Sequence, residues 1–361
     1  MAKGSSYAVI GLMLILCLVT TTGMAAAVPY LWQTNAVSND IHIYELETFL
    51  LVKRLMVDAR PYGIAAPDDA HVVYISVADK GSRQSELLWV DPQTVAISHR
   101  LAVGPEPYTI ATTPDGRWVY VPCRDGYYWV IDAQSKTIVT RIHTGGQPYD
   151  ALASRDGRYM YLSPMGEPER VTIVDIAADH RIVGRIPFGG SVQLAALAAN
   201  QTFFFQQVDG LNGFQVADIG QRSVIATIAH KTALGKLIPV ERLGWLTPQG
   251  FKRCHGLAIR PDQQEIWSVC AEHLTIHALR PPDFPERHTL ELADQGFSLT
   301  FTPDSRYAFV ALQHRNQVAV VDTETKAVVR HLDAGEAPER GLVITVPPLA
   351  TTQQREHQRE Q

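Results

Sequence analysis

The sequence contains none of the short motifs that commonly mark a catalytic or cofactor site. We find no Cys-x-x-Cys-His for covalent haem, no His-Glu-x-x-His, no Gly-x-Ser-x-Gly and no Gly-x-x-x-x-Gly-Lys loop. An active site assembled from distant segments stays open, but no reaction can be named. These absences favour a protein that is not an enzyme, and they name no cofactor.

The chain also has little excess charge of either sign. Its 361 residues include 32 Lys and Arg against 37 Asp and Glu, a formal net charge of -5. No basic stripe offsets this balance, which argues against nucleic-acid binding. With 46% hydrophobic and 19% charged residues, the composition indicates one large soluble domain.

Cysteine is scarce, with four in the whole chain. Cys254 and Cys270 face each other across a predicted hairpin that turns at Asp262, so we expect a disulfide there, with two buried thiols as the alternative. Cys123 stands where Cys270 stands in its own repeat and has no partner at hand, so we expect a buried thiol.

An uncharged apolar segment lies near the N-terminus. It spans residues 8–28 after a single charge at Lys3, which predicts an export signal or a membrane anchor. Ala25-Ala26-Ala27 fits a cleavage site after Ala27. We therefore expect residues 1–27 to direct export to the periplasm or the outside of the cell, with membrane contact only if they are retained.

The rest of the chain repeats short apolar runs separated by turns. Residues 110–146 contain four such runs, which is the unit of a β-propeller. The units can be followed by the residue that ends each third strand, roughly 41 to 46 residues apart with one gap of roughly 60. These residues are Glu45, Asp91, Asp132, Asp175, Asp218, Ala278 and Asp322.

Seven second strands carry an aromatic residue at matching positions, which predicts a ring of side chains packed between neighbouring blades. They are Tyr30, Tyr74, Tyr120, Tyr161, Phe204, Trp267 and Phe309. The first unit lacks an innermost strand, and residues 341–346 can supply it and close the ring. We predict an all-β, seven-bladed propeller of four-stranded antiparallel blades over residues 28–348, followed by a disordered polar tail, 349–361.

The chain resembles the YVTN-type β-propeller repeat proteins of exported bacterial proteins. The resemblance covers residues 30–346 and rests on PDGRWVYV with VIDAQSKTIV and GGQPY, and on PDSRYAFVALQHRNQVAVVDTETKAVVRHLDAG. No unit spells Tyr-Val-Thr-Asn, and the unit around Ala198-Ala199-Asn200 lacks the Pro-Asp-Gly turn. The resemblance implies a scaffold with many uses, related in fold to propellers that hold d1-type haem.

Propeller ligands usually bind at the mouth of the central channel, where each inner strand begins. Three of these places carry Pro-Tyr, which makes Tyr62, Tyr108 and Tyr149 either packing residues or a ring around a ligand. His255 opens another inner strand and is the functional candidate among the histidines. His273 and His277 could join it around a metal, but we expect no metal site.

The long junction, residues 230–252, interrupts the repeat on the same face. It contains Lys236, Arg242 and Trp245, which we expect either to contact a ligand or partner or to belong to a passive cover over the channel.

Our leading hypothesis is an exported binding module, most simply a monomer, that recognises a small ligand or a partner protein through this face. The alternative is a redox-associated periplasmic propeller, a haem d1 protein or a quinone-enzyme accessory, with His255 as axial ligand. A lactonase-like hydrolase is a third reading, for which Glu106 and Glu339 are the carboxylates available at the mouth. The identity of the ligand does not follow from the residues.

Overall fold

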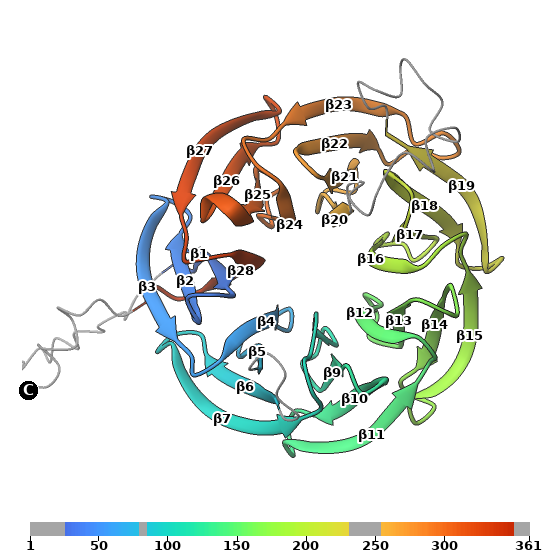
Figure 1. Cartoon of the computed structure of the whole chain (residues 1–361). Coiled ribbons are helices and arrows are strands. Elements are labelled where there is room, and N and C mark those ends of the chain that lie inside the picture. The colour runs from blue at the N-terminus through green and yellow to red at the C-terminus, as the bar shows by residue number, and fades with distance from the viewer. Residues whose placement is uncertain (1–25, 79–84, 231–253, 350–361) are drawn as a thin grey trace, which may run out of the picture.

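The computed structural model describes residues 26–78, 85–230 and 254–349. It consists of seven sheets of four strands, arranged as blades around a central axis (Figure 1). All strand pairs within the blades are antiparallel, so the predicted seven-bladed propeller is confirmed. Within the described residues, a short 3-10 helix, η2 (Gln313–Arg315), interrupts the strands.

Each blade has an inner and a second strand. The inner strands surround the axis and are, from blade 1 to blade 7, β28 (Pro338–Val346), β4 (Arg60–Ala65), β8 (Ala111–Thr112), β12 (Gln147–Ala153), β16 (Val192–Leu197), β20 (Cys254–Ile259) and β24 (Gly296–Phe301). The second strands are β1 (Val28–Asn35), β5 (Val73–Ala78), β9 (Trp118–Pro122), β13 (Tyr159–Met165), β17 (Phe203–Val208), β21 (Glu265–Cys270) and β25 (Tyr307–Leu312).

The outer half of each blade consists of a third and a fourth strand. The third strands are β2 (Asp40–Glu45), β6 (Ser85–Asp91), β10 (Tyr127–Asp132), β14 (Arg170–Asp175), β18 (Gly213–Asp218), β22 (His273–Ala278) and β26 (Gln317–Asp322). The fourth strands are β3 (Leu50–Met56), β7 (Ala96–Val103), β11 (Thr137–His143), β15 (Arg181–Pro187), β19 (Ser223–Ala229), β23 (Glu286–Glu291) and β27 (Ala327–Asp333).

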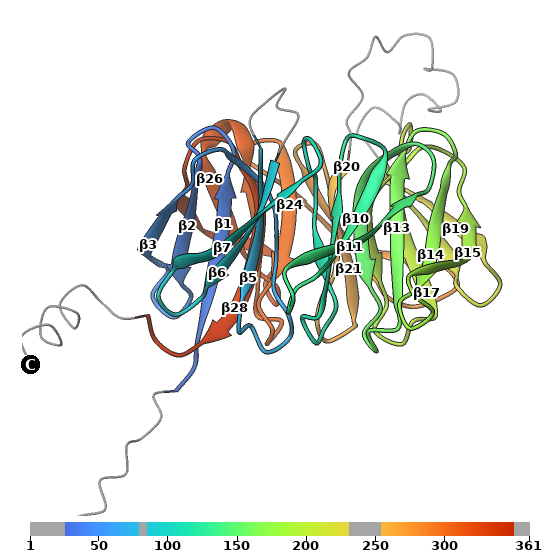
Figure 2. The same cartoon turned by 90° about the horizontal axis from the view of Figure 1, so that it is seen from below.

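The ring is closed by pairing of the first and last strands. Antiparallel partners include Val28 with Val346 and Tyr30 with Ile344, so β28 is the inner strand of the blade that β1 begins. Figure 2 shows the start of β1 and the end of β28 on the same side of the ring. Closure leaves no open edge between blade 1 and blade 7.

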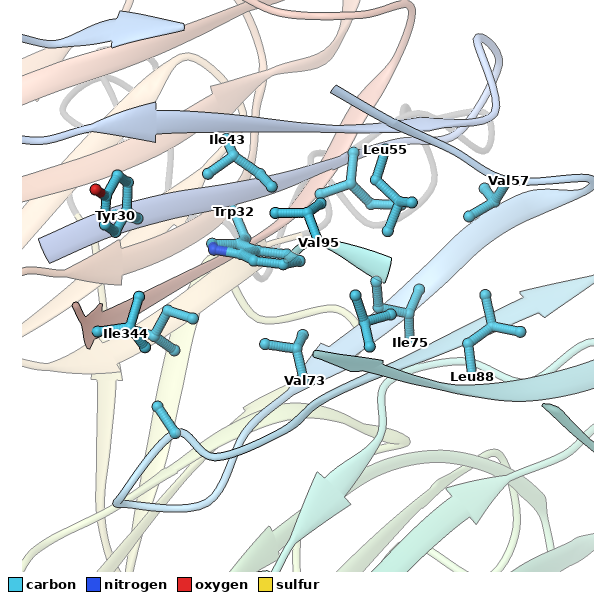
Figure 3. Close-up of a cluster of buried hydrophobic side chains, with 14 of the residues drawn as sticks. Tyr30, Trp32, Ile43, Leu55, Val57, Val73, Ile75, Leu88, Val95 and Ile344 are labelled. Atoms are coloured by element: carbon cyan, nitrogen blue, oxygen red, sulfur yellow. The ribbon is translucent and has the colours of Figure 1, made fainter. Parts of the chain in front are cut away.

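The core lies between the blades. Each of the seven second-strand aromatics is 2% exposed or less, because successive blades press against them from both sides. Figure 3 shows one such contact, where Tyr30, Trp32 and Ile43 of blade 1 pack against Val73 and Ile75 of blade 2. The aromatic repeat seen in the sequence is therefore a packing device.

The acidic repeat has a local cause. The third strands end at the positions followed in the sequence, and the carboxylate there binds the turn that comes next. In blade 3, Asp132 Oδ1 accepts hydrogen bonds from the backbone N–H groups of Gln134 at 3.0 Å and Ser135 at 2.9 Å. These bonds favour the charged carboxylate and lower the pKa of Asp132.

Two features concern individual strands and cysteines. The inner strand of blade 3 is short, because residues 107–110 lie outside the ladder and β8 contains Ala111 and Thr112 alone. The register sets Cys254 opposite Cys270, and a disulfide joins them with a Cα–Cα distance of 4.0 Å. Cys123 is fully buried as a free thiol, and burial raises its pKa well above the ordinary value.

Several predictions fall on residues outside the described part. These are the export or anchor segment up to residue 25, most of the junction with Lys236, Arg242 and Trp245, and the polar tail from residue 350. Across the described ranges, no helix has the length and apolar character needed to cross a membrane.

Candidate functional site

The inner strands all begin at the end of the ring opposite to the end of β28, and we call this end the mouth. Here the ladders between inner and second strands shift register. The shifts fall between Pro61 and Ile64, Pro148 and Asp150, Val192 and Ala195, Cys254 and Gly256, and Gly296 and Leu299, and in blade 1 between Pro338 and Gly341.

These bulges determine which side chains leave the sheet at the mouth. A β-bulge releases a residue from the ladder and redirects its side chain. The released residues include Tyr62, Tyr149, His255, Phe297 and Arg340. Proline favours such breaks because it has no N–H to give to the ladder, which explains Pro-Tyr at this position. Pro-Tyr is thus both structural and the reason that the tyrosines leave the sheet.

Tyrosines of three successive blades form a continuous arc. The ring centroids of Tyr62 and Tyr108 are 6.2 Å apart, and those of Tyr108 and Tyr149 are 5.0 Å apart. The guanidinium of Arg60 lies 4.6 Å from the centre of the Tyr62 ring. Gln147 Nε2 donates to the Tyr108 hydroxyl at 3.1 Å, which holds that ring in place. The structure therefore brings together all three predicted tyrosines.

A second aromatic group comes from the other side of the ring. The imidazole of His255 stacks on Phe297 with centroids 5.0 Å apart and an interplanar angle of 19°. The guanidinium of Arg340 lies 5.5 Å from the centre of the same Phe297 ring. His255 is half-buried and lies at the start of β20, at the mouth.

The two groups meet at an ion pair. Arg60 Nη2 contacts Glu339 Oε1, and Glu339 is 5% exposed. Burial raises the pKa of Glu339, and the positive charge of Arg60 opposes this rise. The other mouth arginine, Arg340, forms no ion pair with any carboxylate of the described residues.

Sequence reasoning missed one buried carboxylate. Asp150 follows Tyr149 in β12 and accepts hydrogen bonds from Thr109 Oγ1 at 2.7 Å and from the backbone N–H of Ala195 at 3.0 Å. Burial raises the pKa of Asp150, while the charge of Arg340 lowers it. An acidic residue inside the apolar run QPYDALA was the signal available. Phe297 and Arg340 were missed too. The residues that begin the seven inner strands differ from blade to blade, so neither residue belongs to a repeat that the sequence could reveal.

Close backbone approach brings blades 2 and 3 together at the arc. A Cβ built on Gly63 would lie 2.7 Å from both Tyr108 O and Ile110 N. Only glycine allows this approach, which sets the distance between Tyr62 and Tyr108.

The other candidates are engaged elsewhere. Glu106 pairs with Arg124 at 2.5 Å, so both carboxylates considered for hydrolysis are bound to arginines. His277 stacks on His230 and His255 stacks on Phe297, so the histidine trio considered in the sequence is not assembled.

A cavity of about 500 Å³ lies between blades 2 and 3, away from these residues. Its walls include Tyr74, Trp89, Asp115 and Arg117. Most of its polar groups serve the fold: the Tyr74 hydroxyl donates to the Gly116 carbonyl at 3.1 Å, and Asp115 Oδ1 accepts from Thr113 Oγ1 at 2.5 Å. We therefore place the candidate site at the mouth.

Comparison with known proteins agrees with this architecture. The family model of the cytochrome D1 heme domain matches residues 107–193, which contain Tyr108, Tyr149 and Asp150. No curated protein matches the sequence. The periplasmic gluconolactonase PpgL of Pseudomonas aeruginosa is similar in structure, with a TM-score of 0.69 and 14% identity over 89% of this chain and 100% of that one.

This chain is a seven-bladed β-propeller in fold. A structure of the dihydro-heme d1 dehydrogenase NirN in complex with DHE gives a TM-score of 0.61 at 15% identity, covering 87% of this chain and 74% of NirN. Hydrazine synthase of Kuenenia stuttgartiensis gives 0.66 at 14% identity, covering 81% and 97%. At such identities the likeness shows the fold, and the function must be argued from the mouth.

Proposed function

We propose that this propeller is a binding module that holds a small ligand with an anionic group and a flat ring at its mouth. The observation that carries the proposal is Arg340, which stands on the inner strand β28 with its guanidinium over Phe297 and forms no ion pair with a carboxylate of the described residues. The mouth also contains the arc of tyrosine rings. A charged group in such a place favours a counter-charge, and a carboxylate or phosphate supplies one.

The aromatic residues suit the rest of the ligand. Tyr62 in β4 and Tyr108 just before β8 are partly exposed, and the buried Tyr149 of β12 packs behind them. Because neighbouring groups hold these rings, the arc presents ring surface at a low cost in conformational entropy. The Arg60–Glu339 pair is neutral overall and holds two neighbouring inner strands together. In this proposal Arg340 and the tyrosines contact the ligand, while Arg60 and Glu339 hold the two inner strands in position.

Export belongs to the same proposal. The apolar segment at residues 8–28 supports it, and so does the periplasmic origin of PpgL, a structural neighbour. The protein would then meet its ligand in the periplasm or outside the cell, and a partner protein would approach by the same face.

The test is the small-molecule content of the folded protein. Protein purified from its own host is denatured, and the released compounds are measured by mass spectrometry. We expect an anionic compound in the wild type, and its loss in Arg340→Ala and Tyr108→Ala. Arg287→Ala, which removes an exposed arginine of β23, is the matched control and should keep it. Equal content in Arg340→Ala and Arg287→Ala would refute the assignment.

The match to the cytochrome D1 heme domain supports a second candidate, a tetrapyrrole of the haem d1 type. The donor set fits such a group: His255 offers an imidazole, Arg340 offers a cation for a ring carboxylate, and the tyrosines offer flat surfaces. A bound haem would supply a redox-active iron. The chain's own part would be to orient the group with Arg340 and to exclude water with Phe297 and the tyrosine arc.

An absorbance spectrum of protein from its own host separates the two candidates. A haem predicts a Soret band that is lost or shifted in His255→Ala but kept in His288→Ala, an exposed histidine of β23. A spectrum with aromatic absorption alone favours the colourless ligand.

A further inference from the structure

Two histidines are stacked in the interior between blades 5 and 6. His230 follows β19 and His277 belongs to β22, in the neighbouring blade (Figure 1). They are 9% and 2% exposed, and their ring centroids lie 5.2 Å apart at an interplanar angle of 25°. The Phe214 ring stands edge-on to both, at 6.0 Å from His230 and 5.3 Å from His277. The pair thus lies in an apolar setting between the outer halves of the two blades.

Three nitrogens of this pair have no hydrogen-bond partner. His277 Nδ1 lies 2.9 Å from the carbonyl oxygen of Phe284 and must donate to it, which leaves Nε2 as a bare lone pair. That Nε2 and both ring nitrogens of His230 are buried without a partner. Buried polar atoms are almost always satisfied, so three orphans in one place indicate that something binds there.

The protonation state suits a metal ligand. Burial lowers the pKa of both imidazoles, that of His230 to about 3, so both are neutral at physiological pH. A neutral imidazole keeps a free lone pair. In addition, metal-binding histidines usually donate their other ring N–H to a backbone carbonyl, as His277 does to Phe284.

The spacing also suits a shared ion. Metal–nitrogen bonds of about 2.0–2.1 Å put each ring centre roughly 3.2 Å from the ion, so two imidazoles at a tetrahedral angle have centres about 5.2 Å apart. The measured separation of His230 and His277 is 5.2 Å. Simple stacking explains this distance as well, but it leaves all three nitrogens without a partner, whereas a shared ion would bind one nitrogen of each ring.

We propose that His230 and His277 bind one divalent transition-metal ion of the Zn, Ni or Cu class, with water completing its coordination. The described residues contain no group of three or more metal-ligating side chains. This part of the chain therefore supplies two ligands, the imidazoles of His230 and His277. His273, exposed at the start of β22, is near enough for its charge to lower the pKa of His230. It is not a ligand in this proposal. The ion would tie blade 5 to blade 6, independently of any ligand at the mouth.

The test uses the full-length protein stripped with EDTA and titrated with Zn(II) or Cu(II) alone. Calorimetry should give one ion per chain, and thermal melting should shift upward. His230→Ala should weaken binding by about 10- to 100-fold. His288→Ala, on the exposed face of β23, is the control and should bind like the wild type.

A spectroscopic measurement guards against a misfolded variant. The electron paramagnetic resonance spectrum of the wild-type protein with one Cu(II) should show hyperfine coupling to imidazole nitrogens. Wild-type protein that binds neither ion more tightly than His230→Ala, or a copper spectrum without nitrogen coupling, would overturn the proposal. Neither result bears on the ligand site proposed at the mouth, which involves other residues.

Discussion

The two ends of the propeller use the same repeat in different ways. At the end opposite the mouth, which we call the turn end, six of the seven third strands end in a carboxylate, and those of Asp132 and Asp322 bind the next turn. At the mouth the corresponding positions differ from blade to blade and include Tyr62, His255 and Arg340. The comparison teaches that the repeat maintains the fold, and that the residues proposed to bind a ligand are departures from it.

The largest loss of stability should come from truncating an aromatic residue of the core rather than one of the mouth. Phe204 is fully buried between blades, so Phe204→Ala should lower the free energy of unfolding by about 3–5 kcal/mol. The half-buried Phe297 of the mouth should cost about 1 kcal/mol on the same change, because less surface leaves contact. Urea unfolding measures both, and equal losses would contradict the division between the ends.

The second largest loss of stability is expected for Arg60, a mouth residue with a structural role. Arg60→Ala leaves the buried Glu339 without its partner, and we expect a loss of about 2 kcal/mol, below the range of fully buried pairs because Arg60 is partly exposed. The double variant Arg60→Ala/Glu339→Gln should recover part of it.

The pH dependence of that variant follows from the sign of the shift. Glu339 already has a raised pKa in the folded protein, and removal of Arg60 raises it further. The native state then binds more protons than the unfolded state above the ordinary pKa of a glutamate, so stability falls as pH rises through the raised pKa. The loss in Arg60→Ala should be smaller at pH about 4.5 than at pH about 7.5. A loss independent of pH would contradict this account.

The turn end should respond more mildly. Asp132→Ala removes two hydrogen bonds to backbone N–H groups and should cost about 1–2 kcal/mol, whereas Asp132→Asn keeps an acceptor oxygen and should cost less. Since the pKa of Asp132 is lowered in the folded protein, its contribution is present above the unfolded pKa of about 3.9 and is lost as pH falls through the folded value. Urea midpoints between pH about 2 and 7 measure this, and a flat difference between wild type and variant would argue against it.

The smallest change in stability is expected for Tyr108→Phe. It removes the hydrogen bond from Gln147 and little packing, so the cost should be about 0.5–1 kcal/mol. Thermal melting measures it. A larger loss would mean that the tyrosine arc supports the fold rather than a ligand.

The fold was predictable because its signals repeat. Seven aromatics and a recurring acidic residue each reinforce the same count, and they appear at the expected places in the second and third strands. Closure was predictable because the first unit lacked an inner strand that residues 341–346 could supply.

The mouth was predictable in part. Pro-Tyr repeats three times and pointed to the tyrosine arc, and His255 was found by its place at the start of an inner strand. Arg340, Phe297 and Asp150 each occur once, and their proximity depends on blades far apart in sequence. The stacking of His277 on His230 likewise joins two blades and leaves no local pattern.

The central claim is that the mouth binds and the core holds the ring. The most direct measurement is the ligand content per folded molecule of Arg340→Ala and Phe204→Ala, prepared side by side from the native host below their melting temperatures. The account predicts that Arg340→Ala is stable and empty, while Phe204→Ala is destabilised and loaded. A loaded Arg340→Ala protein, or an empty but folded Phe204→Ala protein, would contradict it.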